Sequence, residues 1–77
     1  MSSQMPYFVM LFKSVNYALK AEKILKSCGI PHKLIPVPKQ ISSDCGICLR
    51  FEAQYRQAIE TNLHSKAEFE EVRQLTG

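Results

Sequence analysis

The chain has 77 residues, of which 45% are apolar and 22% are charged, and its formal net charge is +3. A chain this short buries only about 60% of its unfolded surface, so it supports one small domain, residues 1–77, and its composition excludes an intrinsically disordered protein. The longest apolar run, residues 7–12, is far below the roughly 20 residues of a membrane span. No secretion signal precedes this run, and we therefore expect a cytoplasmic protein with no membrane segment.

The first part of the chain predicts a strand and a helix. Residues 7–12 are apolar on both faces and rich in aromatic side chains, as in a central strand. Ser14 is a suitable N-cap for a helix that ends at Gly29. The apolar positions that recur along this helix at spacings of three and four are Tyr17, Ala21, Ile24, Leu25 and Cys28. We therefore predict that Cys28 is a buried core residue and not a reactive thiol.

The rest of the chain predicts three strands and a second helix. Residues 32–37 alternate in polarity, and after a polar loop residues 47–52 alternate again, so each segment is expected to be a strand. Residues 53–64 have the periodicity of a helix. Residues 69–75 fit either a helix or a polar outer strand, and we favour the strand.

The resulting order of elements, βαββαβ, predicts an α+β fold: a ferredoxin-like two-layer sandwich in which two helices cover one face of an antiparallel sheet. In this topology the first strand is central and the second strand lies at an edge. Pro36 and Pro38 cannot donate ladder hydrogen bonds, which independently confines the second strand to an edge. The local rule and the global topology therefore support each other.

Cys45 and Cys48 form a C-x-x-C pattern where the polar loop meets the third strand. A structural zinc site needs about four ligands. Beyond these two thiols the chain offers only Cys28, His32 and His64, in no spacing typical of metal ligands. We therefore expect no metal and no other bound cofactor.

A thiol oxidoreductase that uses both Cys45 and Cys48 is one alternative function. Thioredoxin-like dithiols lie at a helix amino terminus, whereas this pair runs into a predicted strand. In an extended chain the two α carbons would be about 10 Å apart with side chains on opposite faces, beyond the roughly 7 Å limit for a disulfide. A disulfide would require a turn at Gly46. Cys48 is therefore interpreted as a strand residue whose side chain lies either on the helix side or on the open face of the sheet. In the oxidoreductase alternative, Cys48 is the second thiol.

Cys45 is the stronger candidate for chemistry, because it ends a polar loop and precedes a glycine. The residues predicted to assist it are Ser42, Ser43, Gly46, Lys39 and Arg50. The glycine allows close approach of a ligand to the backbone, the serines offer turn hydrogen bonds, and successive backbone N–H groups could hold an anion. The two basic side chains could stabilise a thiolate, while Asp44 would oppose its formation.

The amino-terminal half is the basic half of the chain, which raises the alternative of a non-catalytic module that binds a protein or a nucleic acid. Most of the lysines concerned fall in or beside the first predicted helix, where a solvated face explains them. The first strand offers Tyr7, Phe8 and Phe12 for base stacking, but "GICLRFE" lacks the aromatic pattern of an RNA-binding third strand. Nucleic acid is therefore the less favoured partner.

The segments "ALKAEKILKSCGI" and "LIPVPKQISSDCGICLRF" resemble the family described as putative selenium/sulfur carrier protein-like, and the likeness extends from Tyr7 to about Val72. The cysteine that distinguishes the family falls on Cys45. At the position of Cys48 the relatives usually carry a small apolar residue, so the C-x-x-C pattern is a departure from the family.

This resemblance implies a small thiol carrier rather than an enzyme. Cys45 would accept sulfur or selenium from a donor such as a cysteine desulfurase or a selenocysteine lyase. It would hold the atom as a persulfide or selenosulfide and deliver it to an acceptor enzyme. The pyridoxal phosphate needed for C–S cleavage would belong to the donor.

Overall fold

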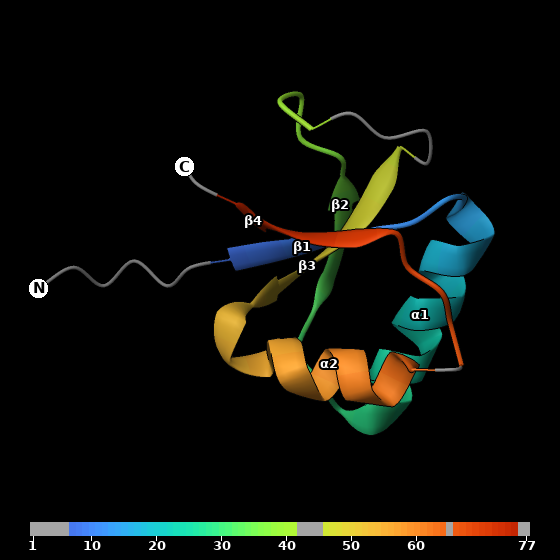
Figure 1. Ribbon diagram of the computed structural model, residues 1–77. Helices are drawn as coiled ribbons and strands as arrows, with labels where there is room; N and C mark the ends of the chain where they lie inside the picture. Colours follow the sequence, from blue (N-terminus) through green and yellow to red (C-terminus); the bar gives the residue numbers. More distant parts are fainter. Residues whose placement is uncertain (1–6, 42–45, 65, 76–77) are drawn as a thin grey trace, which may run out of the picture.

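The computed structural model describes residues 7–41, 46–64 and 66–75 (Figure 1). Its elements are β1 (Tyr7–Leu11), α1 (Val15–Cys28), β2 (Lys33–Pro36), β3 (Ile47–Glu52), the 3-10 turn η1 (Ala53–Tyr55), α2 (Arg56–Leu63) and β4 (Glu71–Leu75). The order βαββαβ is the one predicted from the sequence. The second predicted helix begins as a 3-10 turn and continues as α2.

The four strands form one antiparallel sheet in the order β2-β3-β1-β4, with α1 and α2 together on one face (Figure 1). The ferredoxin-like α+β prediction is therefore confirmed. Strand β1 is central and β2 is at an edge, where Pro36 needs no partner on its outer side. The ambiguous segment 69–75 contains strand β4, which is polar because it forms the other edge and only one side of it pairs with β1.

Local signals account for the ends of α1. Ser14 occupies the N-cap position, and its carbonyl accepts a hydrogen bond from the Ala18 N–H at 3.2 Å, although its hydroxyl makes no capping bond. Gly29 ends the helix with φ +72°, a left-handed conformation that favours glycine. The Ile30 N–H then donates to the Leu25 carbonyl at 3.1 Å, which turns the chain back toward the core.

The sheet separates two apolar clusters. The larger lies between the sheet and the helices, and its most buried large side chains are Met10, Phe12, Leu25, Leu49, Phe51, Ile59 and Leu63. The smaller lies on the opposite, open face of the sheet and contains Val9, Leu11, Ile41 and Cys48. We call this smaller group the open-face cluster. Two half-buried side chains of the β2 edge, Ile35 and Val37, pack against it.

The prediction that Cys28 is buried is wrong, since this side chain is exposed. The buried positions of α1 are Ala18, Ala21 and Leu25, whereas Tyr17 is 39% exposed. Cys28 is the last residue of α1, and its turn lies beside α2 rather than over the strands (Figure 1). Its Sγ lies 3.5 Å from Oδ1 of Asn62, a polar and partly exposed neighbour.

Candidate functional site

Three of the predicted site residues, Ser42, Ser43 and Cys45, lie outside the residues that the structure describes. The residues on either side of them are described. Ile41 is the last described residue after β2, and Gly46 directly precedes β3. Ile41 and Gly46 are therefore the described anchors of the site.

Gly46 is the anchor on the β3 side. Its backbone angle φ is +86°, a value that residues with a side chain rarely adopt, so a glycine suits this position. Its carbonyl accepts a hydrogen bond from the Val37 N–H at 3.0 Å. This bond extends the pairing of β2 with β3 by one step and closes the base of the loop. Among the described residues, nothing lies within 4 Å of a Cβ placed on Gly46.

Ile41 is the anchor on the β2 side. Its N–H donates to the Pro38 carbonyl at 2.9 Å, which forms a turn with Lys39 at its exposed tip. The Ile41 side chain is only 8% exposed, because it folds back onto the open-face cluster. The loop is thus held at both ends, one end by a hydrogen bond and the other by apolar burial.

Cys48 is fully buried, with 0% of its surface exposed, in the open-face cluster beside Ile41. It pairs across the ladders with Leu11 of β1 and Ile35 of β2. The sequence left two positions for Cys48, the helix side and the open face of the sheet, and the structure places it on the open face. Ile41 was not recognised from the sequence as the residue that covers this thiol, because polar neighbours surround it in the chain.

Arg50 lies near the other end of β3 from Gly46. Three residues lie between these two positions, and the four steps of extended strand span about 13 Å. The Arg50 guanidinium carbon is 4.7 Å from the centroid of the Tyr7 ring, and Tyr7 pairs with Glu52, still farther along the strand. Arg50 is therefore held at a distance from the loop, and its sequence-based assignment to the thiol stays a prediction.

Lys13 is a basic residue that sequence reasoning did not assign to the site. The register pairs Leu11 with Cys48, so the chain that continues from β1 to Lys13 leaves the sheet at the same end of the strands as Gly46. Lys13 is exposed and lines a shallow pocket of about 360 Å³ together with Glu68 and Glu70. Only the strand register reveals this proximity, since Lys13 and Gly46 are far apart in the sequence.

Comparison with known proteins identifies the family. The model of the family described as putative Se/S carrier protein-like matches residues 7–72. The chain belongs to this family. Neither the curated proteins nor the solved structures include a significant match.

The matched region of this Se/S carrier-like chain runs from the start of β1 into β4 and spans both anchors of the loop. The resemblance noted from the sequence is therefore confirmed. None of the helices in the described ranges is long and apolar enough to span a membrane. The same ranges contain no group of three or more His, Cys, Asp or Glu side chains placed to hold a metal ion.

Proposed function

We propose that this member of the Se/S carrier-like family is a cytoplasmic carrier that holds a sulfur or selenium atom on Cys45. The observation that carries the proposal is the family match, which covers the segment containing Cys45. The described anchors support it, because Ile41 and Gly46 hold the ends of a short connection at one end of the strands. A loop held on a rigid scaffold is a common way to present a reactive group to a partner.

The proposed transfer needs no net oxidation. The Cys45 thiolate attacks the terminal sulfur of a donor persulfide, the donor S–S bond breaks, and a new S–S bond forms on Cys45. The donor leaves as a thiolate, and the proton of the terminal sulfur stays with the transferred atom. Delivery is the same exchange with a nucleophile of the acceptor enzyme. The donor is a cysteine desulfurase or, for selenium, a selenocysteine lyase.

The neighbours of Cys45 have distinct roles in this proposal. Gly46 supplies the backbone conformation, while Ser42 and Ser43 supply turn hydrogen bonds. Lys39 is at the exposed tip of the adjacent turn, and Lys13 approaches from the end of β1. Either ammonium would favour the charged form of a persulfide by simple attraction.

The burial of Cys48 favours a carrier over a thiol oxidoreductase. A resolving thiol must reach its partner's sulfur, and reactivity follows exposure. Cys48 is 0% exposed and is packed among Val9, Leu11 and Ile41 on the open sheet face. Its thiol would have to leave that cluster before it could form a disulfide.

The test is the intact mass of the protein after incubation with a cysteine desulfurase, pyridoxal phosphate and free cysteine. We expect a gain of about 32 Da, the mass of one sulfur atom on one thiol. Peptide mapping should place this sulfur on Cys45, and a thiol reductant should remove it.

Three single variants are the controls. Cys45→Ala should abolish loading, whereas Cys48→Ala and Cys28→Ala should retain it. Loading that persists in Cys45→Ala would disprove the carrier assignment. Loss of loading in Cys48→Ala, with the fold retained, would instead favour the dithiol mechanism.

A further inference from the structure

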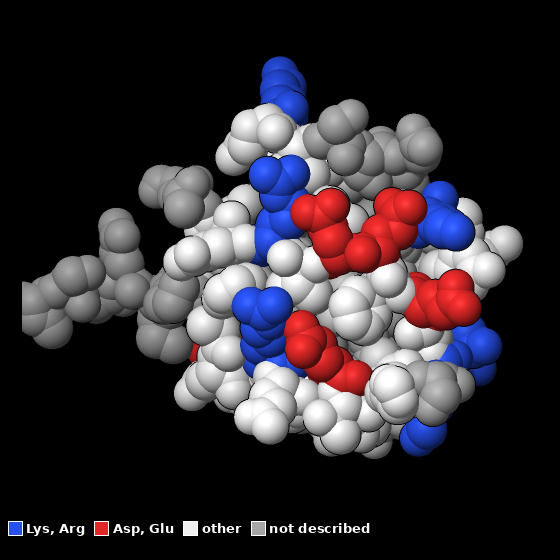
Figure 2. Space-filling model, viewed as in Figure 1, with Lys and Arg blue, Asp and Glu red and all other residues white. Residues whose placement is uncertain are grey.

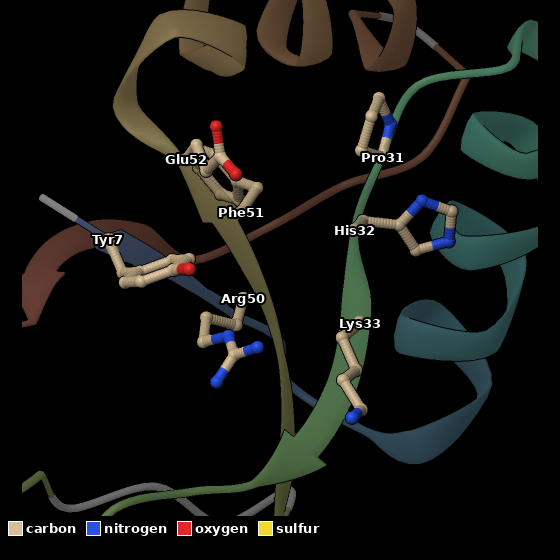
Figure 3. Close-up of a pocket in the computed structure, with 7 residues that line it drawn as sticks. All are labelled: Tyr7, Pro31, His32, Lys33, Arg50, Phe51 and Glu52. Atoms are coloured by element: carbon tan, nitrogen blue, oxygen red, sulfur yellow. The ribbon is translucent and has the colours of Figure 1, made fainter. Parts of the chain in front are cut away.

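A pocket of about 200 Å³ lies beside β2 and β3, at the opposite end of these strands from Gly46 (Figure 3). Its lining includes Tyr7, Pro31, Lys33, Arg50 and Glu52. Pockets for drug-sized ligands measure about 300–1,000 Å³. This pocket is therefore large enough only for a small molecule or for one end of a longer one.

Two cations meet at this pocket. Lys33 of β2 is directly opposite Arg50 of β3 in the ladder, so both side chains are on the open face of the sheet. Side chains in such a pair have β carbons about 5 Å apart, and like charges there are unfavourable. Within the described residues, neither Lys33 nor Arg50 forms an ion pair.

The other two arginines of the chain have acidic partners. Arg56 pairs with Glu60 at 3.0 Å, and Arg73 lies 3.5 Å from Glu71. Figure 2 shows basic side chains with acidic ones beside them over α2 and β4. Arg50 is thus the one arginine without an ion pair among the described residues, and it lies opposite Lys33 in the ladder.

The acidic side chain of the pocket does not neutralise the pair. Glu52 accepts a hydrogen bond from the Gln54 amide at 2.7 Å, and its carboxylate lies at the far end of the pocket from the Lys33 ammonium (Figure 3). His32 contributes no hydrogen-bonding group to the pocket either. Its two ring nitrogens are engaged by the Ile30 carbonyl at 2.7 Å and by Glu22 at 3.0 Å.

The contact with Tyr7 positions Arg50 to bind a ligand. The guanidinium carbon lies 4.7 Å from the ring centroid, which is within the range of a cation–π contact. A guanidinium over a ring face keeps its N–H groups directed outward in its own plane, where they match the two oxygens of a carboxylate or phosphate. The ring limits the motion of a long side chain, so less entropy is lost when an anion binds.

We propose that this pocket binds the oxyanion group, carboxylate or phosphate, of a small organic molecule. Arg50 donates in-plane hydrogen bonds to the anion and Lys33 supplies the second positive charge. Tyr7 and Pro31 form the wall against which the organic part of the molecule packs. This site is separate from the loop that precedes Gly46, and the proposal does not depend on the carrier function.

The test is a titration followed by ¹H–¹⁵N NMR, with inorganic phosphate and phenyl phosphate as probes and sodium chloride at matched ionic strength as the reference. We expect saturable shifts of the Lys33 and Arg50 amide signals and of the Arg50 Nε–H signal. Phenyl phosphate should bind more tightly than inorganic phosphate, because its ring contacts the pocket wall.

The variants are Lys33→Gln, Arg50→Gln and, as a matched control, Lys39→Gln, which removes one exposed positive charge outside the pocket. Each pocket variant should weaken binding about tenfold or more, the factor expected of one charge-assisted hydrogen bond. Lys39→Gln should leave the affinity within about twofold of the unmodified chain, since surface charges this distant are screened.

Non-saturable shifts in the unmodified chain would overturn the proposal. So would an equal loss of affinity in all three variants, which would mean an adventitious ion only. If Arg50→Gln proves unstable, the Lys33→Gln variant still decides the result, because Lys33 is an exposed residue of an edge strand.

Discussion

Native-state labelling of the two described cysteines tests the arrangement of the open face most directly. In a Cys45→Ala background only Cys28 and Cys48 can react with an alkylating reagent. Cys28 is exposed, so it should react as a free peptide thiol does. Cys48 is 0% exposed and belongs to a strand that is paired on both sides, so it must wait for the structure to open.

The expected difference follows from the cost of that opening. A domain of this length has a total stability of about 4–12 kcal/mol. Exposure of Cys48 requires Ile41 to leave the open-face cluster and the chain around β3 to loosen. If this opening costs about 3 kcal/mol, Cys48 reacts roughly 100-fold more slowly than Cys28.

The assay is limited alkylation with iodoacetamide, quenched at intervals and quantified for each cysteine by peptide mass spectrometry. In denaturant the two thiols should react at similar rates, which provides the reference. Ile41→Ala should speed the labelling of Cys48 and leave that of Cys28 unchanged, because only the cover of Cys48 is removed. Native labelling of Cys48 within about tenfold of Cys28 would refute the described burial.

Three further predictions concern stability. Lys33→Glu replaces a like-charge pair by an opposite-charge pair with Arg50, and should raise Tm by about 2–4 °C at low salt, a gain of about 0.5 kcal/mol. Lys39→Glu is the control for the same change of charge elsewhere on the surface. A Tm that is unchanged or lowered in Lys33→Glu would contradict the ladder register. Gly46→Ala should cost about 1–2 kcal/mol in urea unfolding because φ is +86°, whereas a neutral effect would mean that the left-handed conformation is not required. His32→Ala should cost about 1–2 kcal/mol, because both ring nitrogens are hydrogen-bonded. The double variant with Glu22→Ala should cost less than the sum of the single variants, and full additivity would argue against the contact.

The sequence by itself determined the order of the elements and much of the topology. Hydrophobic periodicity is a local property, so it located the strands and helices. Pro36 placed β2 at an edge, because proline has no N–H to donate to a second neighbouring strand. Gly29 marked the end of α1 for an equally local reason, its left-handed backbone. The same local patterns placed Cys48 in a strand but did not determine which face of the sheet its side chain occupies.

Only the tertiary structure decided which thiols are covered. Helical spacing put Cys28 near the buried stripe of α1, but the position of the last turn beside α2 leaves it exposed. Cys48 is buried because Ile41, from a loop with polar neighbours, folds onto the open face of the sheet. Strand register likewise brought Lys33 opposite Arg50. Such contacts join residues distant along the chain, and their free energies depend on packing and register, which local patterns do not encode.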